Sequence, residues 1–385
     1  MKVALVHDFL NVYGGAERVL EAIHDLYPYS HVYTSLHDPT KLPLRMHNWD
    51  IRPFKLPKLP LVHFLKYYTA FYPFLFEGLD LSDYDLVISS TAFFAKGIKT
   101  RPGALHISYI HTPPRYLYHY ESSMNKREIF IYRPILAVLD NFFRIWDYQA
   151  AQRPDYLLAN SKQVASRIKK FYRREVTVIY PGVDLPSPDI HKEKNFAKQY
   201  VIPKEAPQEE EAVSQLDSGS YYLLVSRLLP YKRVDLAIEA ANRLNLSLKI
   251  VGTGPEGKRL KKMAGSSVEF LGFVSDERLS YTYSNCEAVI FPTDEDFGIV
   301  PVEAMHFGKP VISFARGGSL ETVLAGKTGE FFSEPTVYSL VQALEKFNPK
   351  EYKPADCRAQ AEKFSVARFK KEFTGFIESK VAEKK

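Results

Sequence analysis

The sequence predicts an α/β protein with two doubly wound parallel-sheet domains, and three observations support this. Short apolar runs alternate with helical patterns along most of the chain, and Gly-containing turns follow many of the runs. Residues 186–220 are polar and contain prolines, which is typical of a linker. A chain of 385 residues has room for two domains of ordinary size. We therefore place the first domain at residues 1–185 and the second at 221–363.

The first series of elements opens with a strand at 3–6, a turn that contains Gly14 and Gly15, and a helical pattern at 16–26. Two glycines let a ligand approach the backbone closely, although a tight turn without a ligand would have the same sequence. The other elements expected in this domain are strands at 85–90, 106–110, 156–161 and 176–180 and an aromatic helix at 128–152.

His111 follows the strand at 106–110 and precedes a Pro-Pro pair that fixes the loop. A histidine at the carboxyl end of a strand is well placed to face a cleft, whereas a single histidine is more often structural. Arg115 lies in the same loop. With this neighbour, the functional and the structural interpretations of His111 carry equal weight.

Excess positive charge is confined to the first half of the chain. Residues 1–185 carry 23 Lys and Arg against 17 Asp and Glu, whereas the remainder carries 28 against 28. Residues 51–76 contain no acid and are rich in Phe and Tyr. Such a segment can lie in a membrane interface, or it can be an ordinary helix that covers a sheet. The charge also suits a pyrophosphate-bearing substrate, and surface composition alone would explain it equally well.

No segment offers the roughly 18 consecutive apolar residues that a membrane span requires. The amino terminus is a strand that His7 and Asp8 interrupt, which does not fit a signal peptide. Cys286 and Cys357 have no metal-binding spacing, and a reducing compartment explains them more simply than a disulfide. We expect a cytoplasmic protein that can touch the inner face of the membrane.

The second series begins with a strand at 222–225, whose following loop contains Arg227 and Lys232. Arginine offers a planar fork and lysine a point charge, and a diphosphate suits both. Basic loops are often merely solvated, so this pair indicates little by itself. A helix is expected at 234–244 and further strands at 248–251, 268–272 and 310–314.

The stretch 293–309 reads T-D-E-D-F-G-I-V-P-V-E-A-M-H-F-G-K and follows an apolar strand at 288–291. A strand, a Gly-containing loop and a helix in succession place backbone N–H groups at the carboxyl end of a sheet, where ligands bind. If Glu295 lies in the loop and Glu303 in the helix, both carboxylates can accept hydrogen bonds from sugar hydroxyls. Acids near a helix start also arise from the helix dipole alone.

Cations for a diphosphate and carboxylates for hydroxyls in one domain together predict a site for a nucleotide-diphospho-sugar. The pair Glu295 and Glu303 also allows a two-carboxylate hydrolysis. We reject hydrolysis because the nearby cations favour a diphosphate leaving group. Asp294 and Asp296 are interpreted as loop and cap residues, and no D-x-D motif is placed to hold a metal.

These motifs resemble the retaining glycosyltransferases of family 4, along nearly the whole chain. The segments that carry the resemblance are S-R-L-x-x-x-K at 226–232, E-D-F-G-I-V-P-V-E-A-M at 295–305, G-G-A-E-R at 14–18 and Y-I-H-T-P-P-R-Y at 109–116. The last two resemble bacterial polysaccharide mannosyltransferases. Two positions depart from the usual pattern, since Ser226 and Arg233 stand where glycine is common. Neither departure removes a charged partner.

The resemblance implies the GT-B fold, with two Rossmann-like domains facing a cleft and a C-terminal helix, at about 364–385, that crosses back to the first domain. It implies that Arg227 and Lys232 hold the donor diphosphate. Glu295 would face the donor hexose as a catalytic residue, and Glu303 would bind the ribose hydroxyls. The remaining roles implied are backbone contacts from Phe297, Gly298 and Ile299, close approach of the first domain to the diphosphate at Gly15, stabilisation of the reacting centre by His111, and acceptor binding by Arg115.

The expected activity is transfer of a hexose, foremost mannose from GDP-mannose, to a saccharide or lipid-linked saccharide in surface polysaccharide or glycolipid synthesis. No metal or other cofactor is expected, because cations at the leaving group would stabilise its charge. The alternatives are a UDP-sugar donor, a nucleotide-sugar epimerase of the same layout, and a non-enzymatic polyanion-binding protein. Nucleic acid is not expected as a partner.

Overall fold

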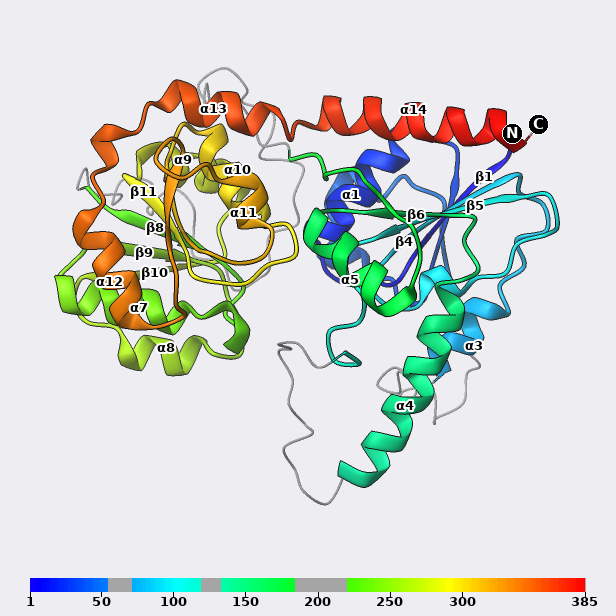
Figure 1. Ribbon diagram of the computed structural model, residues 1–385, viewed down its shortest axis with the longest axis horizontal. Helices are drawn as coiled ribbons and strands as arrows, with labels where there is room; N and C mark the ends of the chain where they lie inside the picture. The colour runs from blue at the N-terminus through cyan, green and yellow to red at the C-terminus, as the bar shows by residue number, and fades with distance from the viewer. Residues whose placement is uncertain (55–70, 119–132, 184–219, 385) are drawn as a thin grey trace. The chain divides into compact units, whose positions relative to one another are not determined.

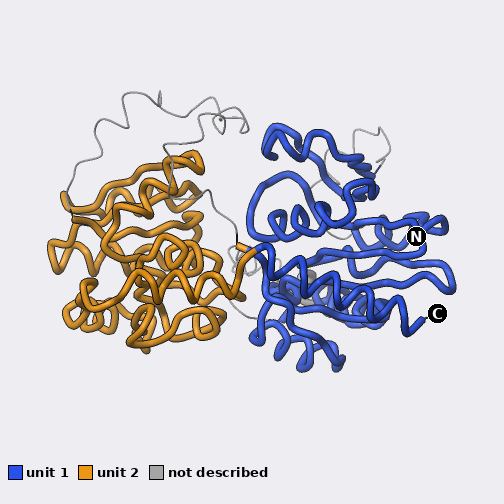
Figure 2. The backbone as a smooth tube through the Cα atoms, turned by 90° about the horizontal axis from the view of Figure 1, so that it is seen from above, with its two compact units in different colours: residues 1–182, 366–385 blue, residues 183–365 orange. Residues whose placement is uncertain are grey.

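The computed structural model describes residues 1–54, 71–118, 133–183 and 220–384. The chain divides into two compact units, each with its own parallel sheet (Figures 1 and 2). Unit 1 contains Met1–Gly182 and Val366–Lys385, and unit 2 contains Val183–Ser365. The predicted linker and the middle of the basic aromatic segment 51–76 lie outside the described residues.

Unit 1 is built on a parallel sheet whose strand order in the described residues is β3-β2-β1-β4-β5-β6-β7. Its strands are β1 (Val3–His7), β2 (His31–Thr34), β3 (Ile51–Pro53), β4 (Leu86–Thr91), β5 (Leu105–Ile110), β6 (Tyr156–Ala159) and β7 (Thr177–Val178). Every residue of β4 and β5 is buried, as expected for central strands that are covered on both faces.

Helices cover both faces of this sheet. The helices of unit 1 are α1 (Gly15–His24), α3 (Tyr72–Glu77), α4 (Arg133–Ala150), α5 (Lys162–Tyr172) and α14 (Val366–Lys384), with short 3₁₀ turns η1 (Pro39–Lys41), η2 (Leu44–Met46) and η4 (Ala95–Gly97). Apolar residues of α1 and α14 share one core cluster with alternate residues of the strands. Residues of α3 and α4 form a second cluster and residues of α5 a third, with the strand residues that point the other way.

The C-terminal helix α14 completes the core of unit 1. Phe369, Phe373 and Ile377 are buried against Leu20 and Tyr109, although more than 250 residues separate them from these partners in sequence. This confirms the expectation that the C-terminal helix returns to the first domain.

Unit 2 has a second parallel sheet, with the order β10-β9-β8-β11-β12-β13 in the described residues. Its strands are β8 (Tyr222–Val225), β9 (Leu248–Val251), β10 (Val268–Gly272), β11 (Ala288–Phe291), β12 (Val311–Phe314) and β13 (Gly329–Phe332). Figure 1 shows α7, α8 and α12 on one side of this sheet and α9, α10 and α13 on the other. Its helices are α7 (Val234–Leu244), α8 (Gly257–Met263), α9 (Asp276–Asn285), α10 (Ile299–His306), α11 (Ser319–Thr322), α12 (Val337–Lys346) and α13 (Pro354–Glu362), with 3₁₀ turns η8 (Pro230–Lys232) and η9 (Pro349–Glu351).

The strand order reverses once in each sheet. In unit 1 the chain first moves outward from β1 to β2 and β3 and then returns to β4 on the other side of β1. In unit 2 the same reversal falls between β8 and β11. In open α/β sheets, ligands bind beyond the carboxyl ends of the strands at such a switch point. Each unit therefore has a definite place for a site.

Candidate active site

The two loops at the switch point of unit 2 carry the predicted donor-binding residues. Lys232 ends η8 in the loop that follows β8, and Glu295 lies in the loop that follows β11. Their side chains form an ion pair, and the side chain of Lys232 is 14% exposed and that of Glu295 19%. The hydroxyl of Thr293 also donates to the carbonyl oxygen of Tyr231, at 3.2 Å. The structure thus brings together two residues that the sequence assigned to one site.

The backbone at Lys232 is fixed by its neighbours. Pro230 begins η8 and presets its φ angle, and Arg233 ends it in a left-handed conformation with φ 51°. The guanidinium of Arg233 turns away to Asp235 at the start of α7. Lys232 is therefore the cation of this turn that faces Glu295.

Glu295 is held by a third loop, which follows β12. The N–H of Gly318 donates to the carbonyl oxygen of Glu295 at 2.8 Å, and Gly317 pairs with Glu295 in a parallel bridge. Gly317 has φ +71°, and a Cβ there would collide with the Glu295 carbonyl oxygen. The guanidinium of Arg316 also contacts Asp294 at 3.2 Å. The sequence analysis predicted the strand at 310–314 but did not assign these glycines to the site.

Helix α10 begins directly after the loop that follows β11. Gly298 occupies its N-cap position with φ +80°, so the backbone N–H groups of the first helical turn, from Ile299, have no partner within the helix. Phe297 is buried and packs edge-on against Phe364, at 5.6 Å between ring centroids. This aromatic contact anchors the residue that precedes the helix start.

Glu303 lies inside α10 and is buried, and the hydroxyl of Tyr283 donates to its Oε2 at 2.8 Å. Tyr283 is a partner that the sequence analysis missed, because it belongs to α9. One carboxylate oxygen of Glu303 is therefore hydrogen-bonded within unit 2.

Arg227 is exposed, and within the described residues no ion pair or hydrogen bond of its guanidinium is formed. Its loop packs closely on the turn that follows β9. A Cβ at Gly252 would collide with the carbonyl oxygen of Ser226, and one at Gly254 with that of Leu228. Glycine at both positions therefore lets the two loops touch, which places Arg227 beside the strand ends.

His111 follows β5 at the carboxyl edge of the unit 1 sheet and is only 9% exposed. Its backbone N–H donates to the carbonyl oxygen of Thr91 at 2.8 Å, and its carbonyl oxygen accepts from the Asn160 side chain at 2.9 Å. The backbone of His111 is thus fixed from the two neighbouring strands.

A buried chain of hydrogen bonds joins His111 to the first Gly-Gly turn. The Nε2 atom of His111 lies 2.8 Å from the Ser90 hydroxyl, which lies 3.2 Å from Nδ1 of His7. The Nε2 atom of His7 lies 3.4 Å from Glu17, whose other oxygen accepts from the Gly14 N–H at 2.8 Å. We call His111, Ser90, His7 and Glu17 the polar relay.

The polar relay fixes the tautomer of His111 when His7 is neutral. The Glu17 carboxylate only accepts, so His7 carries its proton on Nε2 and its Nδ1 accepts from Ser90. The Ser90 oxygen then accepts from Nε2–H of His111, which leaves the His111 Nδ1 as a hydrogen-bond acceptor. Burial, with a smaller contribution from His7, lowers the pKa of His111 to about 3, so the ring is neutral near pH 7.

Asp8 anchors the loop that follows β4. Its carboxylate accepts hydrogen bonds from the Thr91 hydroxyl and from four consecutive backbone N–H groups, those of residues 92–95, at 2.7–3.0 Å. Both His7 and Asp8 interrupt the first apolar run of the sequence. Polar residues that interrupt an apolar strand could have indicated a functional role for His7 and Asp8. The sequence analysis used them only as an argument against a signal peptide.

Gly15 is the first residue of α1, and Arg115 is half-buried in the turn that follows His111. The relay brings the turn before Gly15 into the same cluster as His111.

Two protein-family models each match one part of the chain. A model described as Glycosyltransferase Family 4 matches residues 13–186, and one described as Glycosyl transferases group 1 matches residues 207–364. The chain therefore contains a glycosyltransferase family 4 domain followed by a glycosyl transferase group 1 domain. The two matched regions contain every predicted site residue and all the strands of the two sheets except β1.

Relatives extend this family assignment. The chain is 26% identical over 399 residues to a protein of Dictyostelium discoideum named alpha-1,3/1,6-mannosyltransferase ALG2, covering 90% of this chain and 89% of the relative. It is 26% identical to O-antigen chain mannosyltransferase C of Escherichia coli, covering 52% of this chain and 49% of the relative.

The fold has a solved counterpart in Anabaena Alr3699/HepE, whose crystal structure contains UDP. The TM-score is 0.67 at 20% identity, and the match covers 98% of this chain and all of the other. This glycosyltransferase therefore has the GT-B fold, as its sequence predicts.

Proposed function

We propose that this glycosyltransferase moves mannose from GDP-mannose to a saccharide or lipid-linked saccharide acceptor, with retention of configuration. The observation that carries the proposal is the pairing of Lys232 with Glu295 at the switch point of unit 2. It joins a cation suited to a diphosphate to a carboxylate suited to sugar hydroxyls. Two relatives named as mannosyltransferases support the choice of sugar.

The chemistry follows from these charges. A lysine ammonium has three donors, so Lys232 can keep its contact with Glu295 while it binds a phosphate oxygen. Arg227 supplies a second cation. Together they offset the charge that develops on the departing diphosphate, which is the role that a metal has in other enzymes. Glu295 orients the hexose, and the start of α10 offers backbone N–H groups to the phosphates.

His111 acts on the transferred sugar. In its neutral form it provides a hydrogen-bond acceptor at Nδ1 in a position from which solvent is nearly excluded. An acceptor there can orient a sugar hydroxyl and stabilise positive charge at the reacting carbon. Arg115, four residues later, is proposed to contact the acceptor.

A ligand-binding experiment tests the donor assignment. Purified protein is titrated with GDP-mannose, GDP, UDP-glucose, UDP-N-acetylglucosamine and UDP in the presence of EDTA, and thermal unfolding is followed. A ligand present at ~100 times its dissociation constant should add ~2.7 kcal/mol of stability. Stabilisation by the guanine nucleotides alone supports GDP-mannose, whereas stabilisation by the uridine ligands alone overturns that donor.

Two variants test whether Lys232 contributes to nucleotide binding. Replacing Lys232 by alanine should weaken GDP binding at least tenfold, because charge-assisted hydrogen bonds are worth about 1.5–3 kcal/mol each. Arg233→Ala is the matched control, because that guanidinium is directed to Asp235. Equal losses in both variants would contradict the assignment.

We also propose peripheral contact with a membrane through unit 1. No helix among the described residues is long and apolar enough to cross a bilayer. Helix α4 nevertheless exposes Val138, Phe142 and Ile145, which lie at positions i, i+4 and i+7 and therefore form one stripe. The positive charge of the first half would favour anionic lipids.

Vesicle flotation tests this contact. The variant Phe142→Ser/Ile145→Ser should bind vesicles of anionic phospholipid several-fold more weakly than the parent protein. Phe273→Ser, which changes an exposed phenylalanine of unit 2, is the control. Unchanged flotation of the α4 variant would overturn the proposal.

A further inference from the structure

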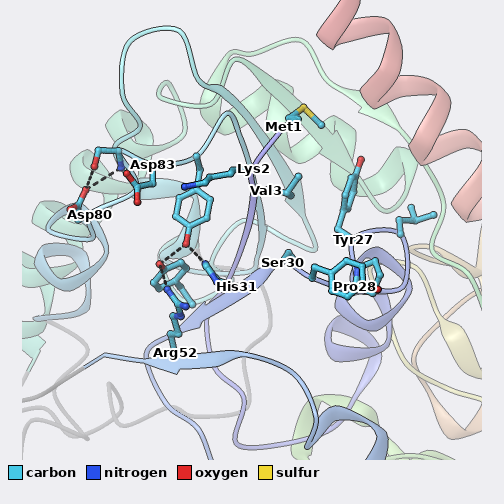
Figure 3. Close-up of a pocket in the computed structure, with 15 residues that line it drawn as sticks. Met1, Lys2, Val3, Tyr27, Pro28, Ser30, His31, Arg52, Asp80 and Asp83 are labelled. Carbon is cyan, nitrogen blue, oxygen red and sulfur yellow. Dashed lines mark hydrogen bonds between the residues drawn. The ribbon is translucent and has the colours of Figure 1, made fainter.

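A pocket lies at the opposite edge of the unit 1 sheet from His111. It opens at the amino ends of β1 and β2 and has a volume of about 590 Å³, within the range of roughly 300–1,000 Å³ that small-molecule sites occupy (Figure 3). Strand β1 alone separates the two edges by ~16 Å, at 3.3 Å per residue. The pocket therefore cannot be part of the site around His111.

The floor of this pocket is a closed ring of hydrogen bonds. Arg52 donates to the Tyr33 hydroxyl at 3.3 Å, and that hydroxyl lies 2.8 Å from the hydroxyl of Tyr84, which contacts Nδ1 of His31. Both His31 and Arg52 then meet the Asp50 carboxylate. Burial, followed by the hydrogen bond to Tyr33, raises the pKa of Tyr84, so the Tyr84 phenol stays protonated at neutral pH.

One polar group of the lining has no partner. Ser30 is 5% exposed, and its hydroxyl forms no hydrogen bond within the described residues. A buried hydroxyl without a partner costs about 1–3 kcal/mol, and such groups are uncommon in folded proteins. Figure 3 places Ser30 beside His31, between Tyr27 and Pro28 on one side and Asp80 and Asp83 on the other. The hydroxyl oxygen is closed off from solvent as it stands, so a ligand hydroxyl would pair with it once the Ser30 side chain turns toward the pocket that it lines.

The lining favours an uncharged ligand with many hydroxyls. Two cations, Lys2 and Arg52, are balanced by two carboxylates, Asp80 and Asp83. A diphosphate would meet these carboxylates, and a lipid chain would meet a polar floor. Aromatic faces are also available, and Tyr29 at the rim is 97% exposed. Tyrosine rings that combine apolar faces with hydroxyl groups suit the two kinds of surface on a sugar ring.

We propose that this pocket binds saccharide, namely the part of the glycan chain that is remote from the reaction. It would retain an acceptor or product while His111 and the donor act on the chain end. This role rests on the proposed function, because only a glycan-extending enzyme has such a chain. Binding of saccharide in the pocket can nevertheless be measured without catalysis.

Calorimetric titration with α-linked mannotetraose tests the proposal, with maltotetraose and inorganic diphosphate as comparison ligands. Ser30→Ala should weaken tetrasaccharide binding at least fivefold without loss of stability, because it removes a hydroxyl that has no partner. Ser108→Ala is the matched control, since Ser108 is also buried in unit 1 with its hydroxyl unpaired among the described residues and lies outside the pocket. Tyr29→Ala should weaken binding similarly and cannot disturb the core.

The outcomes are distinct. Tetrasaccharide binding that both pocket variants weaken and Ser108→Ala retains supports the proposal. Equal affinity in all variants, no binding of either tetrasaccharide, or a pocket-dependent affinity for diphosphate instead would overturn it. Lys232→Ala should keep full tetrasaccharide affinity, so a failed donor assignment leaves this result intact. Pocket-dependent binding of maltotetraose alone would support a saccharide pocket and count against mannose in the proposed function.

Discussion

His111 depends on residues that the sequence does not place beside it. Its Nε2 is held by Ser90, and Ser90 is aligned with His7 by the register of β1 and β4. Because Glu17 keeps the proton of neutral His7 on Nε2, the Ser90 hydroxyl donates to Nδ1 of His7 and accepts from Nε2–H of His111. Ser90 is therefore a positioning residue for His111.

Ser90→Ala should lower kcat about tenfold with little change in the KM for the nucleotide-sugar. The ring of His111 would lose the contact that fixes its tautomer, whereas unit 2 would be unaffected. Steady-state kinetics at saturating acceptor would measure this. Ser89→Ala is the control, because Ser89 is also buried and its hydroxyl pairs with His106 at 2.9 Å. If both variants lose stability and activity equally, the relay has only a structural role.

The two buried histidines also predict how stability depends on pH. Burial is the main cause that lowers the pKa of both His106 and His111 to about 3, well below the value of about 6.5 expected in an unfolded chain. Between these values the unfolded state binds more protons, so stability rises with pH. It is complete above about pH 6.5 and is lost as the pH falls toward 3.

Urea unfolding at several pH values between 7 and 4.5 would measure this slope. Each histidine should contribute at most ~1.4 kcal/mol per pH unit. His106→Gln should flatten the dependence, because glutamine does not titrate. A slope that is identical in the variant and the parent protein would show that His106 is not buried in its neutral form.

Single residues were predictable where they stand at strand ends. Lys232, Glu295 and His111 each follow an apolar run, so their place at the carboxyl edge of a sheet could be inferred. The partners Ser90, Glu17 and Tyr283 could not, because strand register or helix packing brings each of them to the site.

At the scale of elements, three loops of unit 2 meet at Glu295, and the glycines between β12 and α11 make this possible. Gly317 lies in this segment, and Gly326 follows α11. Both have positive φ, at 71° and 69°. They differ in their surroundings: a Cβ at Gly317 would collide with the Glu295 carbonyl, whereas the nearest atom at Gly326 is a flexible side chain 3.9 Å away. Alanine substitutions at the two positions therefore separate the cost of a left-handed backbone from the cost of a steric collision.

Gly326→Ala should cost about 1–2 kcal/mol, the usual penalty of a left-handed conformation. Gly317→Ala should cost at least ~2 kcal/mol more and should weaken donor binding, because it displaces Glu295. Urea unfolding and GDP titration would measure the two effects. Similar losses of stability in both variants, with unchanged GDP affinity, would contradict the role of this close approach.

The presence of helices and strands was predicted better than their first and last residues. Helix α7 has the bounds that the sequence indicated, because its apolar face is regular. The strand expected at 176–180 is reduced to Thr177–Val178, since it lies at the sheet edge and pairs on one side only. The short 3₁₀ turn that carries Lys232 has no periodic signature, although Pro230 marks its start.

For the whole molecule, alternation of strands and helices predicted two parallel sheets, and the structure has them. Strand order was not available from the same pattern, because alternation does not say on which side of β1 the fourth strand returns. The switch points, and so the placement of the sites, became visible only with that order.

The return of α14 to unit 1 makes its apolar residues part of a distant core. Phe373→Ala should destabilise unit 1 by about 3–5 kcal/mol, the usual cost for a buried phenylalanine. Phe376→Ala on the same helix should cost clearly less, because that ring is only partly buried. Urea unfolding would measure both, and equal costs would show that α14 is not docked through Phe373.

This return also sets the order in which the protein can fold during its synthesis. Unit 2 has all of its residues once the ribosome has passed Ser365, whereas unit 1 begins first and waits for residues 366–384. At about 5–20 residues per second, the interval after residue 182 lasts roughly 10–40 s. Throughout it, the surface that Phe369, Phe373 and Ile377 will cover is exposed to water and to other nascent chains. A message truncated shortly before Val366 would therefore release a complete second unit attached to a first unit that cannot close its core.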